Sequence, residues 1–376
     1  MQPTMTAPDF QAWFALLYTP GLTRPAARHL LQALGSPEAV LGASAAQWAA
    51  AAGPAAAQAL ASPDPTAHAR LQRALDWLSA HPARQALALG EPRYPEPLLH
   101  CGDPPLMLFL EGRADLLARP SVAVVGSRQA TPQGLAHARR FAAALSDAGV
   151  TVVSGLAAGI DGAAHEGALR GEGATVAVIG TGPDITYPSR HAGLWRRITE
   201  AGVVVSEYAP GTPALAHHFP HRNRIIAGLT RATLVIEATL KSGSLITARL
   251  ASECGREVFA VPGSIQSPQS KGCHELIRQG AQLVESAEEI LQALQLATPG
   301  VGSSLPTPEA APAEADARTP HGRLLRALGH DPVSLDSLME RTGDSAPELG
   351  AWLLELELQG LVARLPGGRF QRQQAC

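Results

Sequence analysis

The 376-residue sequence predicts an α/β protein with a doubly wound, Rossmann-like parallel sheet, flanked by an N-terminal helical domain and a C-terminal winged-helix domain. From residue 120 onward, short valine-rich runs alternate with helical stretches, and runs without polar alternation indicate strands buried on both faces. Residues 1–85 carry only helical patterns, and residues 320–376 show three helices followed by a hairpin pattern. These three observations fix the expected fold class and its three domains.

Residues 1–85 are expected to form a small helical domain. Helical periodicity covers residues 10–19, 24–34 and 69–80, and Gly- and Pro-containing breakers separate these stretches. A bundle of the sterile-alpha-motif (SAM-like) type is the simplest interpretation. Residues 19–31 also resemble a helix-hairpin-helix turn, although Thr23 stands where a second glycine is expected, so both interpretations stay open.

Residues 86–297 are expected to form the extended Rossmann-like domain, in which 86–119 are a lead-in segment. The apolar runs lie at residues 121–126, 150–155, 175–180, 203–207, 233–238 and 257–263. Helical stretches follow at residues 131–149, 161–171, 187–202 and 244–255. Thr131 before Pro132 is typical of a helix start, because proline is tolerated at the first helical position, and Asp161 is a second candidate cap.

The C-terminal region consists of a linker and a winged helix. Residues 298–319 are rich in Pro, Ala, Ser and Glu without periodicity, which predicts a disordered linker. Helices are expected over residues 321–329, 334–343 and 345–361, and a hairpin over 361–372 that turns at Gly367-Gly368. The third helix carries Glu348, Glu355 and Glu357 but no basic residue, which suits a DNA major groove poorly.

Composition excludes several classes of protein. Hydrophobic residues make up 45% and charged residues 17%, which is ordinary for a globular protein. No apolar run approaches the ~18 residues of a membrane span, and the N-terminus does not have the pattern of a signal peptide. The four cysteines are scattered, which suggests reduced thiols in a cytoplasm. Only two of the 30 basic residues are lysines, Lys241 and Lys271.

Glycine and serine gather where the predicted strands end. Ligands bind beyond the carboxyl ends of the strands in a doubly wound sheet, and unpaired backbone N–H groups there form anion sites. A single loop of this kind is explained by the need for a tight turn. Five such loops at one edge of the sheet, two of them with a basic residue, favour an anion site. The loops are Gly126-Ser127-Arg128, Ser154-Gly155-Leu156, Gly180-Thr181-Gly182, Ser242-Gly243-Ser244 beside Lys241, and Pro262-Gly263-Ser264.

The usual nucleotide and metal motifs fail. Residues 180–185 begin like G-x-G-x-x-G, but Ile185 replaces the third glycine, and no P-loop motif is present. His217, His218 and His221 lack the spacing and the Cys or Asp neighbours of a metal site, so we expect neither metal nor cofactor. With these nucleotide motifs absent, the anionic ligand that remains is the phosphodiester backbone of a nucleic acid. In residues 217–231, Phe219 would stack on a base and Arg222 and Arg224 would contact phosphates, with Asn223 at a base edge or a backbone cap.

Several long motifs, in order, resemble the DNA processing protein A (DprA, also called Smf) family. They are residues 122–128, 152–165, 206–229, 242–263 and 276–284, and the three-part layout also fits. The resemblance implies a non-enzymatic cytoplasmic protein of natural transformation that binds and protects single-stranded DNA and loads the recombinase RecA onto it. It implies DNA-binding roles for Gly126, Ser127, Arg128, Gly155, Phe219, Arg222, Asn223, Arg224, Lys241, Ser242, Gly243 and Ser244.

The resemblance also implies a homodimer, formed through His274, Ile277 and Leu283. Family members often carry asparagine near residues 272–277, where this sequence has Cys273-His274. Arg364, Arg369 and Arg372 leave weak binding of duplex DNA by the winged helix open. A rival function is hydrolysis of nucleoside monophosphates by a related Rossmann-like family of phosphoribohydrolases. In those enzymes a catalytic glutamate closely follows a Gly-rich loop, whereas the nearest acid here, Glu237, precedes the loop.

Overall fold

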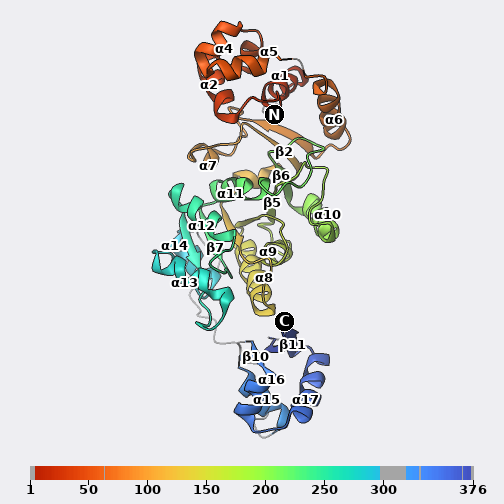
Figure 1. The fold of residues 1–376 in the computed structure, drawn as a ribbon, viewed down its shortest axis with the longest axis vertical. Helices are drawn as coiled ribbons and strands as arrows, with labels where there is room; N and C mark the ends of the chain where they lie inside the picture. The colour runs from red at the N-terminus through yellow and green to blue at the C-terminus, as the bar shows by residue number, and fades with distance from the viewer. Residues whose placement is uncertain (1–4, 63, 297–318, 330–331, 366, 374–376) are drawn as a thin grey trace.

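A computed structural model describes the chain except residues 1–4, 63, 297–318, 330–331, 366 and 374–376. Figure 1 shows three parts along the long axis: helices of the N-terminal segment at one end, a sheet with helices on both faces in the middle, and a small C-terminal domain at the other end. The predicted fold class is therefore confirmed. The predicted disordered linker, residues 298–319, lies almost entirely outside the described residues.

The N-terminal segment is helical, as predicted. Short polar side chains begin several of its helices: Thr6, Thr23, Ser36 and Ser44 each accept a hydrogen bond from a backbone N–H in the first turn, which satisfies a donor that the helix itself cannot pair. The helices are α1 (Ala7–Leu17), α2 (Arg24–Leu34), α3 (Pro37–Leu41), α4 (Ala45–Ala52), α5 (Pro54–Ala61) and α6 (Ala67–Ser79).

Among the described residues, nine strands form one sheet in the order β1-β2-β6-β5-β4-β3-β7-β8-β9. All neighbours from β6 to β9 pair in parallel, and the order reverses beside β3, which is the topology of a doubly wound sheet. The strands of this parallel part are β3 (Ser121–Val125), β4 (Thr151–Ser154), β5 (Thr175–Ile179), β6 (Val203–Ser206), β7 (Ala232–Val235), β8 (Glu257–Ala260) and β9 (Gln282–Leu283).

The lead-in segment extends the sheet, which the sequence did not predict. It supplies β1 (Arg84–Ala88) and β2 (Met107–Gly112), and β2 pairs antiparallel with both β1 and β6. Between them lies the short helix α7 (Glu96–Leu99), and the 3₁₀ helix η1 (Ala114–Ala118) follows β2. Because β1 begins at Arg84, we propose that the second domain begins at this strand rather than at residue 86.

Helices cover both faces of the sheet, and each face has its own apolar core. On one face the core joins alternate strand residues to α8 (Pro132–Asp147), α9 (Ile160–Ala168), α14 (Ala287–Ala293) and, toward β6, α10 (Ala192–Ala201). On the other face it joins them to α11 (His218–Leu229), α12 (Ser244–Glu253) and α13 (Lys271–Arg278). Phe109 of β2 packs with Phe10 and Trp77, so α1 and α6 fasten the N-terminal segment to the sheet.

The C-terminal domain confirms the predicted winged helix. Its helices are α15 (Pro320–Leu328), α16 (Leu335–Thr342) and α17 (Ala346–Leu358), and its strands are β10 (Val333–Ser334), β11 (Val362–Leu365) and β12 (Arg369–Arg372). A separate core of leucines and valines holds these elements together. Across the described part of the chain, no helix combines the length and the apolar character that crossing a bilayer requires.

Candidate functional site

A cavity of about 420 Å³ opens at the carboxyl edge of the sheet, between the ends of β3 and β7 and helix α11. This is where the strand order reverses, the usual ligand position in such sheets. Its lining includes every predicted DNA-binding residue except Gly155 and Arg224. The residues brought together are Gly126, Ser127, Arg128, Phe219, Arg222, Asn223, Lys241, Ser242, Gly243 and Ser244.

The loop after β3 presents Arg128 to the cavity. The Ser127 N–H donates to the Glu237 carbonyl at 2.7 Å, and the Ser127 hydroxyl accepts from the Gln129 N–H at 3.1 Å, so the loop is held on both sides of Arg128. Gly126 is required by close packing, because a Cβ there would lie 2.9 Å from the Glu237 carbonyl oxygen. Arg128 itself is exposed, and its guanidinium lies 5.7 Å from the centre of the Phe219 ring.

Phe219 stands at the start of α11 with one edge of its ring supported. The ring lies 5.2 Å from that of Tyr187, and it passes so close to Gly180 that a Cβ there would lie 3.1 Å from the phenyl carbon Cδ1. Gly180 belongs to a loop after β5 in which we expected an anion site; instead, the glycine makes room for the aromatic ring. Phe219 remains half-buried, so part of its ring faces the cavity and is available for stacking.

Arg222 is buried, and it ties strand ends together. Its guanidinium donates to the carbonyl oxygens of Gly155, at 2.5 Å, and Val178. Burial lowers the pKa of Arg222 to about 10, although the neighbouring Asp161 opposes this shift. Arg222 therefore lines the cavity floor as a fixed cation. Gly155 does not line the cavity; it leaves room for Arg222, since a Cβ there would lie 2.4 Å from Nη1.

Asp161 is a lining residue to which the sequence assigned only a capping role. Its carboxylate accepts hydrogen bonds from the N–H groups of Gly155, at 3.2 Å, and Ala157, at 3.4 Å. Burial raises the pKa of Asp161, while Arg222 acts in the opposite direction. The expected capping position is not confirmed, because Gly159 is the N-cap of α9 and Asp161 lies within the first turn of the helix. Gln269, which also lines the cavity, belongs to the 3₁₀ helix η3 (Pro268–Ser270), and no sequence pattern pointed to it.

The loop between β7 and α12 forms the opposite wall. Lys241 is exposed, and neither it nor Arg128 has an ion-pair partner among the described residues. The hydroxyls of Ser242 and Ser244 lie 2.7 Å apart, and the Asn223 amide donates weakly to the Gly243 carbonyl at 3.4 Å. The cavity thus lies between two cations without ion-pair partners. The backbone N–H groups of the first three residues of α12 already donate to Ser242 and Gly243, so the cations are the anion-binding groups of this wall.

The loop after β4 is held by a buried histidine. Leu156 N–H donates to His165 Nε2 at 3.2 Å, so this nitrogen carries no proton. The proton is therefore on Nδ1, which donates to the Thr175 hydroxyl oxygen at 2.7 Å. Burial, with His191 and Arg222 nearby, lowers the pKa of His165 to about 3. The imidazole is therefore a neutral structural acceptor at physiological pH.

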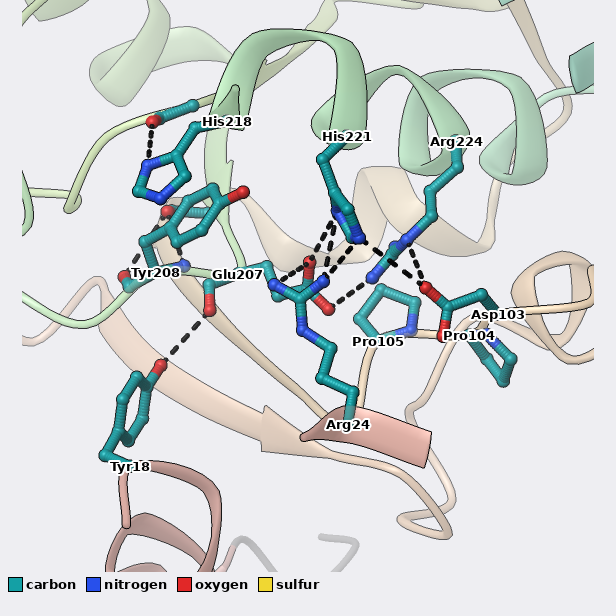
Figure 2. A network of polar contacts seen from close by, with 12 residues as sticks. Tyr18, Arg24, Asp103, Pro104, Pro105, Glu207, Tyr208, His218, His221 and Arg224 are labelled. Atoms are coloured by element: carbon teal, nitrogen blue, oxygen red, sulfur yellow. Dashed lines mark hydrogen bonds and ion pairs between the residues drawn. The ribbon is translucent and has the colours of Figure 1, made fainter. Parts of the chain in front are cut away.

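Arg224 does not face the cavity, which corrects its predicted role as a phosphate contact. It points from the opposite side of α11, toward Glu207 and Asp103 (Figure 2). Its guanidinium lies 2.5 Å from Glu207 and 2.8 Å from Asp103, and the side chain is only 12% exposed. The single positive charge of Arg224 is directed into the protein, because two residues along an α-helix correspond to about 200° of rotation from Arg222.

The rings of His217 and His218 lie 4.5 Å apart, edge to face, but His218 and His221 point toward different partners. His218 Nδ1 lies 3.2 Å from the Gly180 carbonyl and its ring stacks on Tyr208, whereas His221 contacts Arg24. Within the described residues, no three His, Cys, Asp or Glu side chains are grouped as metal ligands would be.

The predicted dimer residues lie at the far edge of the sheet, away from the cavity. His274 Nε2 lies 3.0 Å from the Gly263 carbonyl, Ile277 is half-buried, and Leu283 is 43% exposed on β9. Among the described elements, β9 pairs only with β8. Its outer edge can therefore pair with a strand of another chain.

Family models match two parts of the chain. The model described as DNA recombination-mediator protein A matches residues 85–295, which contain the sheet and the cavity, and the model described as DprA winged helix domain matches residues 308–368. The chain is 43% identical to protein Smf of Escherichia coli over 307 residues, 81% of this chain and 82% of that protein. It is 50% identical to DNA processing protein DprA of Streptococcus pneumoniae over 198 residues, 53% of this chain and 70% of that protein.

Solved structures give the same result. The X-ray structure of DNA processing protein A from Streptococcus pneumoniae superposes with a TM-score of 0.67 at 38% identity, and covers 78% of this chain and 98% of that one. A structure of DNA processing protein A from Helicobacter pylori, which concerns that protein's binding of single-stranded DNA, has a TM-score of 0.52 at 30% identity; it covers 56% of this chain and 96% of that one.

Proposed function

Since this chain belongs to the DNA recombination-mediator protein A (DprA/Smf) family, we propose that it binds single-stranded DNA without sequence preference, protects incoming strands and loads RecA onto them during natural transformation. The observation that carries the proposal is the cavity at the carboxyl edge of the sheet. There the unpaired cations Arg128 and Lys241 flank the accessible ring of Phe219. Cations contact phosphates, and an aromatic face accepts any base, so this arrangement favours binding without sequence readout.

The binding is expected to prefer single strands. A base can stack on Phe219 only if it has left its own stack, because the ring lies inside the cavity between the two cationic loops. The proposed contacts are those of the cavity lining: Gly126, Ser127, Arg128, Phe219, Arg222, Asn223, Lys241, Ser242, Gly243 and Ser244. Gly155 is proposed only to make room for Arg222, and Arg224 is not proposed as a DNA contact.

The test of this function compares one oligonucleotide as a single strand and as a duplex. Fluorescence anisotropy titrations of both forms at several salt concentrations would give two affinities and their salt dependence. Tighter binding of the single strand, weakening as salt rises, is the expected result. Equal or tighter binding of the duplex would contradict the proposal.

Loading of RecA is the finer part of the proposal, and the family's description as recombination mediators supports it. The expected activity is faster assembly of RecA on strands that a single-strand-binding protein already covers. Assembly followed by RecA's DNA-dependent ATP hydrolysis should shorten its lag when this chain is added. A lag that does not change at saturating chain would contradict this part alone, and binding of DNA would stand.

We propose a binding protein rather than a hydrolase because the acids near the cavity are engaged. Glu237 accepts from the Thr131 N–H at 3.0 Å and from its hydroxyl at 2.5 Å, and is thereby held beneath the start of α8. Asp161, the one acid in the described lining, is buried against the backbone N–H groups of its own loop. Incubation with AMP should therefore release no free adenine; release would favour the phosphoribohydrolase alternative.

The remaining proposals concern assembly and location. We propose a homodimer through His274, Ile277 and Leu283, supported by the open edge of β9. A cytoplasmic location fits Cys101, Cys254 and Cys273, which are free thiols. For the winged helix we propose contact with a protein, because Glu348 and Glu357 lie on α17, while Arg364 and Arg369 on the hairpin leave room for weak binding of duplex DNA.

A further inference from the structure

The back of α11 carries a cluster of charges that the cavity does not use. Figure 2 shows His218, His221 and Arg224 pointing from this helix toward the end of β6 and the lead-in segment. The central carboxylate is Glu207, directly after β6, whose side chain is only 5% exposed. A carboxylate this deeply buried must be paired, because its desolvation otherwise opposes folding.

Three parts of the chain meet at this cluster, which we name the rear network: Arg24, Asp103, Glu207, His221 and Arg224. Arg224 of α11 bridges Asp103 of the lead-in segment and Glu207 of the sheet, at 2.8 and 2.5 Å. Arg24, the first residue of α2, lies 3.2 Å from the same Glu207. One buried carboxylate is thus shared by the N-terminal helical segment and the helix that lines the cavity.

A second contact joins Arg24 to α11 directly. Arg24 Nη1 lies 2.7 Å from His221 Nε2. Arginine can only donate, so His221 must be the acceptor, which requires a neutral ring. Burial, together with Arg224 and Arg24, lowers the pKa of His221 to about 4, consistent with this role. The N-terminal segment also reaches the network through Tyr18, whose hydroxyl donates to the Glu207 carbonyl at 3.1 Å.

The two sides of α11 therefore have different tasks. Phe219, Arg222 and Asn223 face the cavity, while His221 and Arg224 face the rear network. A helix moves as a nearly rigid body, so a shift or rotation that the rear network permits would displace Phe219 from the cavity by a similar amount. No residue of the N-terminal helical segment is in the described lining of the cavity.

We propose that the rear network is a positioning device for the single-stranded-DNA site: through Arg24, the N-terminal helical segment holds α11 in the orientation in which Phe219 stacks on a base. This inference rests on the proposed DNA-binding function and deepens it. Arg24 and Arg224 are positioning residues and touch no nucleotide. The helical segment, which contributes nothing to the cavity wall, thereby contributes to affinity.

The test measures single-strand affinity, its salt dependence and thermal stability for Arg24→Ala, with Arg84→Ala as the matched control. Arg84 forms an ion pair of similar exposure with Glu111, at 2.9 Å, between β1 and β2 and apart from α11. We expect Arg24→Ala to weaken binding about fivefold or more, the size of a typical coupling between sites. Its salt dependence should match the unaltered protein, because no phosphate contact is lost. Arg84→Ala should keep full affinity.

A double-mutant cycle separates positioning from general loosening of the fold. If Arg24 acts through Phe219, Arg24→Ala should have little further effect in a Phe219→Ala background, where no ring remains to be positioned. Full additivity would overturn the proposal, as would unchanged affinity of Arg24→Ala or a smaller salt dependence, which would mean a direct phosphate contact. If Arg24→Ala fails to fold, Arg24→Lys, which keeps the charge but not both contacts, takes its place with the same criteria.

The series also tells this inference apart from the proposed function. Lys241→Ala, measured in parallel, should bind more weakly and with a salt slope smaller by about 0.7 if the cavity binds DNA. If Lys241→Ala behaves so and Arg24→Ala does not weaken binding, only the positioning role fails. If neither variant weakens binding, the site itself is wrong.

Discussion

The Arg222 guanidinium donates to the Gly155 carbonyl at 2.5 Å, so a side chain from α11 reaches across the cavity floor to the end of β4. The same guanidinium also bonds the Val178 carbonyl, at the end of β5. One buried cation thus joins two strand ends to a helix. It fixes the floor of the cavity whose walls carry Arg128 and Lys241.

Gly155→Ala should destabilise the protein. The added methyl group would lie 2.4 Å from Arg222 Nη1, and relieving that overlap requires Arg222 to leave its carbonyl partners. Overpacking at a buried site lowers the free energy of unfolding by about 1–3 kcal/mol. Urea denaturation measures the change. Gly193→Ala is the control: this glycine lies in α10 with nothing near its Cβ position, so alanine should leave stability equal or higher. Equal effects of both substitutions would contradict the account of Gly155.

Phe219→Ala should weaken single-strand binding without changing its salt dependence. The ring offers a stacking face but no charge, and loss of base stacking reduces affinity by about 1–3 kcal/mol, roughly 5- to 150-fold. Phe219→Tyr keeps the face and should retain most of the affinity. Titrations with one oligonucleotide at several salt concentrations distinguish the outcomes. A tyrosine variant as weak as the alanine variant would argue against stacking.

Ile277→Arg should convert the proposed dimer to a monomer. The side chain is half-buried on α13 beside the open edge of β9, and an arginine there would place a charge in an apolar interface. Light scattering after size-exclusion chromatography reports the solution mass. Ile265→Arg, at a position 70% exposed and outside the proposed interface, should keep the mass of the unaltered protein. A monomeric unaltered chain at micromolar concentration would refute the dimer.

Stability should fall as the pH drops below about 6.5, in part because of His165 and His221. Folding lowers their pKa values from 6.5 to about 3 and about 4, so the folded protein holds both rings neutral. As the pH falls below 6.5, the two histidines of the unfolded chain bind protons that the folded protein does not bind. The stability that neutral His165 and His221 contribute is therefore complete above pH 6.5, and it is lost as the pH falls toward their folded-state pKa values. Thermal midpoints between pH 7.5 and 4.5, compared with those of His165→Gln, measure the share of His165. Parallel curves for the two proteins would contradict its role.

The sequence was sufficient to predict the central sheet and most of the cavity, for an identifiable reason. Six strands are buried on both faces and therefore read as uninterrupted valine-rich runs, and their order along the chain places their loops at one edge. Arg128 and Lys241 could be placed at this edge because each lies in such a loop. The strands β1 and β2 escaped prediction because they are added antiparallel at the edge of the sheet, outside the repeating pattern.

Arg224 was expected to contact a phosphate, but it lies on the side of α11 that faces away from the cavity. Arg222 and Arg224 are two residues apart in a run rich in cations, and composition does not reveal which side of the helix faces the sheet edge. Only the positions of Glu207 and Asp103, both distant in sequence, decide it. The rear network could not be predicted for the same reason, since its members are far apart along the chain.

The most direct test of the central claim is the salt dependence of single-strand binding by the double variant Arg128→Ala, Lys241→Ala. Each cation that contacts a phosphate contributes about 0.7 to the slope of log affinity against log salt for single strands, so losing both should reduce the slope by about 1.4. We predict this reduction together with weaker binding of every sequence tested. Unchanged affinity and an unchanged slope would show that DNA does not bind between these two loops.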